Sequence, residues 1–412
     1  MGSSSSKPEP LRSQDPTQQR SPSSNETSLI NMHTILPDPD DKNRPSDTPR
    51  TCWAHSNAKS AYDRDLPPCK SLSQLEILRL IGRGSFGKVC LVKRCGGEGV
   101  YALKSLKKEH LIRHSEVEHT LAERLILARI RHPFIVRLES AFQDSTRLFL
   151  LLEFVNGGEL FTHLRNSGHF SPTRVRLYAA EIACALSYLH QHNIIYRDLK
   201  LENILLDQEG HIVLTDFGLS KIGKDGKTFC GTPEYLAPEV ISDGKHSKAV
   251  DWWAFGCIIY ELLTGLPPFY SENINEMYNK TLTQPLYLPP YMNEDTKDFL
   301  RKILRKDPIE RLGSKGFSEI KSHNFFKNMN FDDVFNRRLI PEYIPPTNSP
   351  SDVQHIDQDF LSQAPESFNP LNGIVVPENN PFKGFTYVAG FADKGPRMSA
   401  LSSRLGDDGA LI

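Results

Sequence analysis

The chain has 412 residues, of which 38% are hydrophobic and 24% charged, and its formal net charge is -1 at pH 7. This length allows one two-lobed domain with extensions. The near-zero charge argues against a nucleic-acid-binding protein, which should show a basic excess. No apolar run reaches the 18 residues that a transmembrane helix needs, so we expect none. Seven scattered cysteines without a C-x-x-C pair predict reduced thiols, and neither a disulfide frame nor a zinc site.

Residues 1–74 are a serine- and proline-rich extension that we expect to be disordered, because it buries too little apolar surface to offset the entropy of ordering. Its start fits M-G-x-x-x-[ST], which predicts N-myristoylation at Gly2; a merely serine-rich start is the alternative. One myristoyl chain gives weak, reversible membrane binding, with K of about 10⁴ M⁻¹.

Three further regions follow the extension. Residues 75–326 form the predicted folded domain, with alternating strands over 75–153, broken by one helix, and a mainly helical part over 159–326. Residues 327–392 form an extended tail punctuated by prolines, and residues 393–412 are expected to be disordered.

A glycine-rich loop opens the folded domain. Residues 82–89 fit G-x-G-x-x-G-x-V, and glycines let the backbone approach phosphates closely. The same glycines could open a dinucleotide-binding unit, but the following residues alternate like a strand, where that unit needs a helix. We therefore expect a phosphate-covering loop, with contacts at Gly82, Gly84, Ser85 and Gly87.

A strand lysine and a helix carboxylate come next. Residues 101–104 match the V-A-I-K pattern loosely, so Lys104 is a candidate phosphate ligand. Residues 115–130 have apolar side chains at helical spacing, and this helix contains Glu123, the predicted partner of Lys104. A surface i,i+4 pair is the alternative role for Glu123.

The most informative stretch is residues 196–203, which an Asp-Phe-Gly sequence follows. Phosphoryl transfer depends on positioning and charge more than on covalent help from the protein. Asp198 is the predicted proton acceptor for the substrate hydroxyl, and Lys200 the predicted partner of the migrating phosphate. Asn203 and Asp216 offer the hard oxygen ligands that Mg²⁺ prefers.

Together these motifs resemble those of the eukaryotic protein kinases. Residues 237–239 read A-P-E, and residues 251–256 resemble the family's D-x-W-x-x-G helix, whose Asp251 is implied to support the catalytic loop. Arg311 is the implied partner of Glu239 in a buried pair that fixes geometry. The resemblance implies an α+β, two-lobed fold, with a small antiparallel sheet and one regulatory helix in the N-lobe and a larger, mainly helical C-lobe. It also implies ATP and Mg²⁺ as cofactors.

Within that family the chain is most similar to the AGC group. Tyr196 stands where many kinases have His, as is typical of this group, and residues 229–235 read like its activation segment. Residues 382–387 fit its hydrophobic motif F-x-x-F-[ST]-[FY]. The local sequence of this motif is most similar to that of the ribosomal protein S6 kinases, followed by the serum- and glucocorticoid-regulated kinases.

The resemblance implies the nucleotide contacts beyond the glycine-rich loop. Adenine is expected between the apolar side chains of Val89, Ala102 and Leu205, beside the gatekeeper Leu152. Glu153 and Val155 are expected to offer backbone hydrogen bonds, and Glu159 a carboxylate at the edge of the site.

Thr228 is the implied activating phosphorylation site. A phosphate there adds about -1.5 to -2 charges and could order the activation segment through cationic partners. The expected partners are Arg197, Lys221 and His119; an ordinary exposed loop threonine is the alternative. By resemblance, the modifying enzyme is a kinase of the phosphoinositide-dependent type.

Thr386 is the second implied switch, modified by a TOR-complex kinase. Phe382 and Phe385 are expected to pack between the Glu123 helix and the strand near Leu148, each stabilising by about 1.5–3 kcal/mol if fully buried. Two exposed aromatics on a loose tail are the alternative.

Other parts of the tail depart from the AGC pattern. Ile356 replaces the aromatic of the active-site tether, although Phe360 is retained. No Ser-Pro or Thr-Pro stands where a turn-motif site is expected, although Ser367 lies nearby, so the sequence predicts no regulation at a turn motif.

Acidic residues indicate the substrate. Glu159, Glu202 and Glu261 match positions where AGC kinases bind basic residues, so Arg is expected at minus three and at minus five or minus two. Solvated charges are the alternative reading. We expect a cytoplasmic monomer without nucleic-acid partners; the nucleus and transient membrane contact are further expected locations.

Two other functions were weighed. A catalytically inactive scaffold would usually lack the nucleotide lysine, the base or the metal ligand, yet Lys104, Asp198 and Asp216 are all present. The activation segment and the substrate carboxylates disfavour a small-molecule kinase.

Overall fold

The computed structural model describes residues 66–223, 226–227, 230–363 and 380–389. Several predictions therefore lie outside the described residues. They are the disorder of most of the N-terminal extension, Gly2 myristoylation, the Thr228 side chain, Ser367 and the end of the chain after residue 393.

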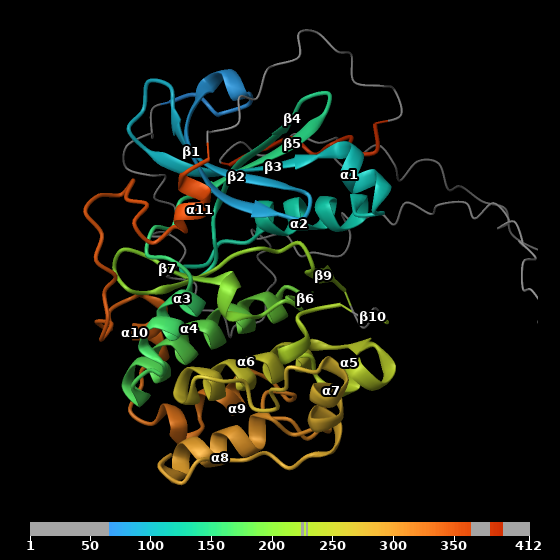
Figure 1. Cartoon of the computed structure of the whole chain (residues 1–412), viewed down its shortest axis with the longest axis vertical. Coiled ribbons are helices and arrows are strands. Elements are labelled where there is room, and N and C mark those ends of the chain that lie inside the picture. Colours follow the sequence, from blue (N-terminus) through green and yellow to red (C-terminus); the bar gives the residue numbers. More distant parts are fainter. Residues whose placement is uncertain (1–65, 224–225, 228–229, 364–379, 390–412) are drawn as a thin grey trace, which may run out of the picture. The chain divides into compact units, whose positions relative to one another are not determined.

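An antiparallel sheet of six strands forms the N-lobe, in the order β1-β2-β3-β5-β4-β12. Figure 1 labels these strands except β12. Apolar residues on its strands point into two buried clusters, and one of these continues into the C-lobe. The strands are β1 (Leu75–Gly84), β2 (Gly87–Arg94), β3 (Val100–Lys107), β4 (Leu138–Gln143), β5 (Arg147–Glu153) and β12 (Tyr387–Val388).

Two helices accompany this sheet. The expected helix is α2 (Val117–Arg129), with Ile126 and Leu127 buried in the main core. The other helix, α1 (Lys108–Arg113), was not predicted from the sequence; it has six residues and buries Leu111. A single buried apolar residue in so short a segment produces no helical period.

The C-lobe is mainly helical, as expected, and short strand pairs are inserted between its helices. The helices are α3 (Leu160–Ser167), α4 (Pro172–Gln191), α5 (Pro238–Asp243), α6 (Lys248–Thr264), α7 (Ile274–Thr283), α8 (Glu294–Ile303) and α9 (Phe317–Lys321). The strands are β6 (Ile194–Ile195), β7 (Ile204–Leu206), β8 (Ile212–Leu214), β9 (Lys221–Ile222), β10 (Gly226–Lys227) and β11 (Lys245–His246).

Two long helices form the centre of this lobe. Ser171 caps α4 by accepting a hydrogen bond from the Arg174 backbone N–H at 3.1 Å, and proline occupies the first turn. In α6, a Cβ at Gly256 would lie 2.7 Å from Ile303 of α8, so glycine allows the two helices to pack closely. Within the described part of the chain, no helix is both long and apolar enough to cross a membrane.

The tail contributes α10 (Phe331–Phe335), α11 (Gln358–Leu361) and the sheet strand β12. Its Tyr343 carbonyl would lie 2.3 Å from a Cβ at Gly210, whose φ is +86°, so this turn requires glycine. Near its end the tail pairs with β4, matching Tyr387 with Ala141. The sequence predicts an extended tail, but it gives no signal for this sixth strand.

Candidate active site

Lys104 is held by two carboxylates from different parts of the chain. Its Nζ lies 2.7 Å from Glu123 Oε1 on α2 and 3.1 Å from Asp216 Oδ1. Burial alone would lower the pKa of Lys104, but Asp216 and Glu123 raise it above its ordinary value, so the lysine stays charged. The expected pairing of Lys104 with Glu123 is therefore present, and α2 determines where the lysine head group lies.

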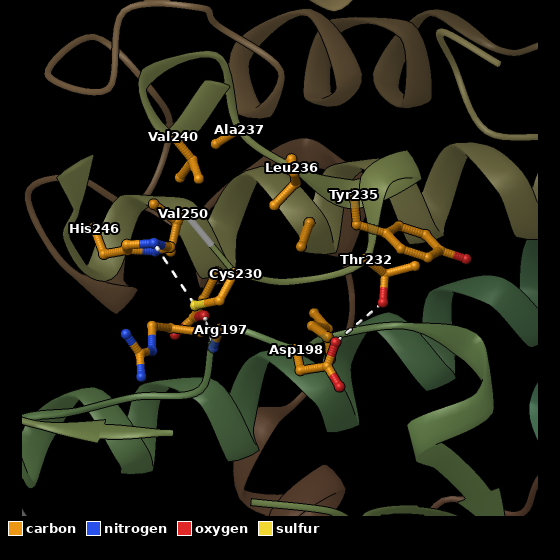
Figure 2. A pocket seen from close by; sticks show the side chains of 13 residues that line it. Arg197, Asp198, Cys230, Thr232, Tyr235, Leu236, Ala237, Val240, His246 and Val250 are labelled. Carbon is orange, nitrogen blue, oxygen red and sulfur yellow. Dashed lines mark hydrogen bonds between the residues drawn. The ribbon is translucent and has the colours of Figure 1, made fainter. Parts of the chain in front are cut away.

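Asp198 is fixed through both of its carboxylate oxygens. Oδ2 lies 3.0 Å from Lys200 Nζ and accepts a hydrogen bond from Asn203 Nδ2 at 2.8 Å. Oδ1 accepts a hydrogen bond from Thr232 Oγ1 at 3.1 Å (Figure 2). Thr232 was not among the predicted site residues, because only folding brings the activation segment to the catalytic loop.

Asp251 of α6 supports the catalytic loop from below. Its buried carboxylate accepts hydrogen bonds from the backbone N–H groups of Tyr196 and Arg197, both at 2.9 Å, and lies 2.7 Å from His190 Nε2. Arg197 has a φ of +67°, an uncommon conformation for a non-glycine residue, which such bonds can maintain. This confirms the expected supporting contact of Asp251.

Asn203 and Asp216 are the residues that would hold magnesium. The Asn203 amide is oriented by its bonds to the Asp198 side chain and to the Asp198 carbonyl oxygen at 2.9 Å. Lys104 lowers the pKa of Asp216, against the effect of burial, so this carboxylate remains ionised. Mg²⁺ commonly takes one or two carboxylates together with substrate phosphates and water, so this small donor set fits the ion.

The glycine-rich loop is the hairpin turn between β1 and β2, where Gly84 pairs with Gly87 and Ser85 lies in the turn. A Cβ at Gly87 would lie 1.7 Å from the Ser105 carbonyl oxygen, so packing alone requires glycine there. A Cβ at Gly84 would meet nothing within 4 Å, and one at Gly82 would make only ordinary contact with Val89, at 3.6 Å. Freedom to approach a ligand is the remaining physical reason for these two glycines.

The expected adenine residues surround the junction of the two lobes. Ala102 on β3 pairs with Leu152 on β5, while Leu205 on β7 forms a bridge with Glu159. These residues and Val89 on β2 are only partly buried, apart from Glu159, which is exposed.

The two hinge positions differ in their backbone bonds. The Glu153 N–H donates to the Arg137 carbonyl at 3.0 Å, so its carbonyl is the group left for a ligand at this position. Among the described residues, the Val155 N–H has no backbone acceptor. The two backbone groups therefore suit a ligand with one donor and one acceptor.

The tail also contacts the glycine-rich loop, a contact that was not predicted from the sequence. Arg83 donates a hydrogen bond to Gln363 Oε1 at 3.2 Å, and α11 lies against β1. Phe360 of α11 packs against the smaller core cluster. Retention of this phenylalanine was the only sequence signal for the contact.

The hydrophobic motif is docked on α2, as expected. Phe382 and Phe385 are 0% and 1% exposed and belong to the main core, together with Leu148. Arg124, the neighbour of Glu123, donates to the Phe385 carbonyl at 2.7 Å, to the Thr386 carbonyl at 3.2 Å and to the Gly384 carbonyl. These backbone contacts could not be read from the sequence. Thr386 itself is exposed.

Two of the three cations expected around Thr228 lie near the described residue Cys230. Burial raises the pKa of Cys230, two residues after Thr228, while Arg197 and Lys221 lower it, so both cations lie near this segment. Figure 2 shows Arg197 beside Cys230, whose sulfur is 3.9 Å from His246 Nε2. His119 instead pairs with Glu116 at 2.8 Å, on its own helix.

Two of the expected substrate carboxylates share an electrostatic neighbour. Burial raises the pKa of Glu261 to about 7, with Glu202 adding to the shift, and Glu261 accepts a hydrogen bond from the Tyr235 hydroxyl at 2.7 Å. Partial desolvation of the exposed Glu159, then Glu202 and the tail residue Asp357, also raises the pKa of Glu159. Asp357 is an acidic neighbour that the sequence analysis did not include.

The activation segment ends in a buried ion pair. Arg311 donates to both oxygens of Glu239, at 2.7 and 2.8 Å, and also to the Ala249 carbonyl at 2.7 Å. The expected pair is present, and its bidentate geometry fixes the A-P-E turn against α6.

Comparison with known protein families identifies the family that has this arrangement of residues. Residues 75–326 match the protein kinase domain, and residues 348–387 match the protein kinase C terminal domain. The chain belongs to the protein kinase family. The combination of this kinase domain with this C-terminal domain confirms the AGC assignment.

Named relatives of the kinase cover most of its length. It is 48% identical over 320 residues to "Protein kinase 2" of Dictyostelium discoideum, covering 76% of this chain and 67% of that protein. It is 46% identical to "Serine/threonine-protein kinase Sgk1" of Xenopus tropicalis, covering 77% and 79%. It is 43% identical to "Serine/threonine-protein kinase Sgk2" of Homo sapiens, covering 84% and 96%.

Proposed function

We propose that this kinase transfers the γ-phosphoryl group of ATP to serine or threonine in protein segments with arginine at minus three. The observation that carries the proposal is the fixed Asp198 carboxylate, with Lys200 and Asn203 on one oxygen and the Thr232 hydroxyl on the other. Relatives named as serine/threonine protein kinases support this choice of acceptor.

Each active-site residue has a proposed role that follows from its position. Thr232 Oγ1 lies 3.1 Å from Asp198 Oδ1, so a substrate hydroxyl at a similar distance could pass its proton to this carboxylate. Lys200, bonded to the same carboxylate, is placed to offset charge on the migrating phosphoryl group. Lys104, held by Glu123, binds the phosphates that remain. Magnesium held by Asn203 and Asp216 would neutralise charge on the phosphate oxygens.

Substrate selection follows from the carboxylates Glu159, Glu202 and Glu261. Glu202 adds to the raised pKa of both Glu159 and Glu261, and a guanidinium placed between these carboxylates would relieve their repulsion. Arginine also binds a carboxylate in a bidentate manner, which lysine cannot do. We therefore expect arginine to be preferred over lysine at minus three.

Activation is proposed to occur in two places. Phosphate on Thr228, added by a phosphoinositide-dependent-type kinase, would bind Arg197 and Lys221 and order the activation segment beside Asp198. His119 joins them only if its bond to Glu116 breaks. Phosphate on the exposed Thr386, added by a TOR-complex kinase, would strengthen docking of the tail on α2.

The proposed cellular setting is the cytoplasm, with the nucleus as a further location. Myristoylation at Gly2 would add transient membrane contact, and the kinase is proposed to act as a monomer without nucleic-acid partners. An unmodified or acetylated N-terminus, measured by mass spectrometry of protein from a eukaryotic host, would remove the lipid from this account.

A peptide library tests the catalytic proposal. Purified kinase, with and without phosphate on Thr228, should modify peptides with arginine at minus three, and the phosphate should increase the rate. Asp198→Asn should abolish transfer while nucleotide binding persists. A preference for acidic or proline-directed sites would contradict the substrate assignment.

A catalytically inactive scaffold is the competing function. Lys104→Met separates the two, because a scaffold would keep its cellular effect without transfer, whereas an active kinase would lose it.

A further inference from the structure

Two cysteines converge on one turn at the start of the kinase domain. Cys69 is 3% exposed and precedes a short 3-10 helix, Leu72–Gln74, whereas Cys95 is exposed and directly follows β2. Pairing of Leu75 with Arg94 between β1 and β2 brings the two segments together. Both thiols are free.

Both sulfurs face carbonyl groups of the same turn. Cys69 Sγ lies 3.7 Å from the Ser71 carbonyl oxygen, and Cys95 Sγ lies 3.9 Å from that of Ser73. The Cys95 backbone N–H also donates to the Gln74 carbonyl at 2.9 Å. Because a 3-10 helix rises only about 2 Å per residue, the carbonyls of Ser71 and Ser73 lie close together along the axis of this turn.

The two thiols differ in reactivity, because Cys95 is exposed and Cys69 is buried. Burial raises the pKa of Cys69; its bond to Ser71 and the nearby Arg94 act against the shift, and Cys95 adds to it. Cys95 is the accessible thiol and reacts first, while Cys69 is protected from direct attack.

We propose that Cys69 and Cys95 form a reversible disulfide when the kinase meets a hydroperoxide. The Cys95 thiolate attacks the peroxide oxygen, which gives a Cys95 sulfenic acid and releases an alcohol, or water from hydrogen peroxide itself. The Cys69 sulfur then attacks the Cys95 sulfur and displaces water. Two thiols and one hydroperoxide become one disulfide, one alcohol and one water.

The bond joins the chain just before β1 to the end of β2. Residues 67–70 form neither helix nor strand, so this segment can adjust to the Cβ separation of about 4 Å that a disulfide needs. The N-terminal extension enters the domain at this point, so oxidation fixes its point of attachment to the sheet. In a reducing compartment such a bond is transient, and a cellular dithiol restores both thiols.

Peptide mapping without reduction tests the proposal. The full-length kinase is treated with hydrogen peroxide, its remaining thiols are alkylated and the protein is digested. A peptide pair linking Cys69 to Cys95 should appear, lighter by two hydrogen atoms than the sum of its parts, and should disappear on reduction. Cys95→Ser and Cys69→Ser should each remove it, whereas Cys90→Ser, a buried cysteine of the same sheet, should not.

Folding and activity are checked on the reduced proteins. Cys95→Ser alters an exposed side chain and should keep the unfolding midpoint and kinase activity of the reduced parent, so the test stands even if Cys69→Ser destabilises the domain. Detection of Cys95 only as a sulfinic acid, or linked to Cys52 or to another molecule, would overturn the assignment.

Discussion

The catalytic loop and helix α2 both position charged groups of the active site, but they are held in different ways. The loop depends on Asp251, a buried carboxylate on the core helix α6 that binds two backbone N–H groups. Helix α2 depends on the tail, whose Phe382 and Phe385 pack into the core about 260 residues further along the chain.

This difference separates a permanent part of the site from an adjustable one. A buried, hydrogen-bonded carboxylate is costly to disturb, so the catalytic loop has essentially one arrangement. Docking of an apolar tail segment is an equilibrium that a few kcal/mol can shift. In the function proposed above, the transfer chemistry therefore belongs to the C-lobe, and the tail would control Lys104 through α2.

The largest expected effect comes from removing the support of the loop. Asp251→Asn keeps the shape but places an amide N–H against a backbone N–H, so the Asp198 carboxylate shifts. We expect kcat to fall by about 100-fold or more, since misplacement by about 1 Å can cost that much. Steady-state kinetics measure it, with Asp295→Asn, at an exposed carboxylate, as the control. A mutant with the parental kcat would show that the catalytic loop keeps its conformation without the Asp251 carboxylate.

A smaller loss is expected when the tail is loosened. Phe382→Ala and Phe385→Ala each remove a buried ring, which typically costs about 3–5 kcal/mol in a core. Because docking is coupled only partly to Glu123, we expect kcat to fall by about tenfold. Lys383→Ala, at the exposed residue between them, is the matched control. Full activity after truncation at Pro381 would remove the tail from the control of α2.

Arg124 tests whether the backbone contacts of the tail matter as well. Arg124→Lys keeps the charge but loses the planar fork that reaches consecutive carbonyls. A loss of about 1 kcal/mol in hydrogen bonding predicts a rate reduced by about fivefold. In the Phe382→Ala background the same substitution should add little, because both act through tail docking. Additive effects would assign Arg124 a separate role.

The smallest expected effect is a change of KM with pH, which arises from Glu261 in the C-lobe. The pKa of Glu261 is raised to about 7, so this group is neutral below that value and negative above it. Its ionised fraction should rise from about a tenth at pH 6 to about nine tenths at pH 8. KM for an arginine-containing peptide should therefore fall by a few-fold as pH rises, relative to a peptide without arginine. Glu261→Gln should flatten this difference; an unchanged profile would exclude Glu261 from substrate binding.

Much of the site was predictable because phosphoryl-transfer residues stand close together in short motifs. The spacing of Asp198, Lys200 and Asn203 determines their relative placement once a tight turn forms, and the η3 turn Leu201–Asn203 supplies it. The alternating strands and the α2 helix followed from hydrophobic periodicity, which is a local property. The six-residue α1 helix was missed because one buried side chain shows no period.

The sequence by itself determined the chemistry of this kinase, namely which carboxylates, lysines and glycines are present and which of them share a loop. Tertiary structure alone decided that Thr232 bonds to Asp198, that Arg124 binds the tail backbone and that Gln363 reaches the glycine-rich loop. The physical reason is that these contacts join segments far apart in the chain through backbone carbonyls or single polar atoms. Such groups carry no periodicity, so only the packed fold shows which of them meet.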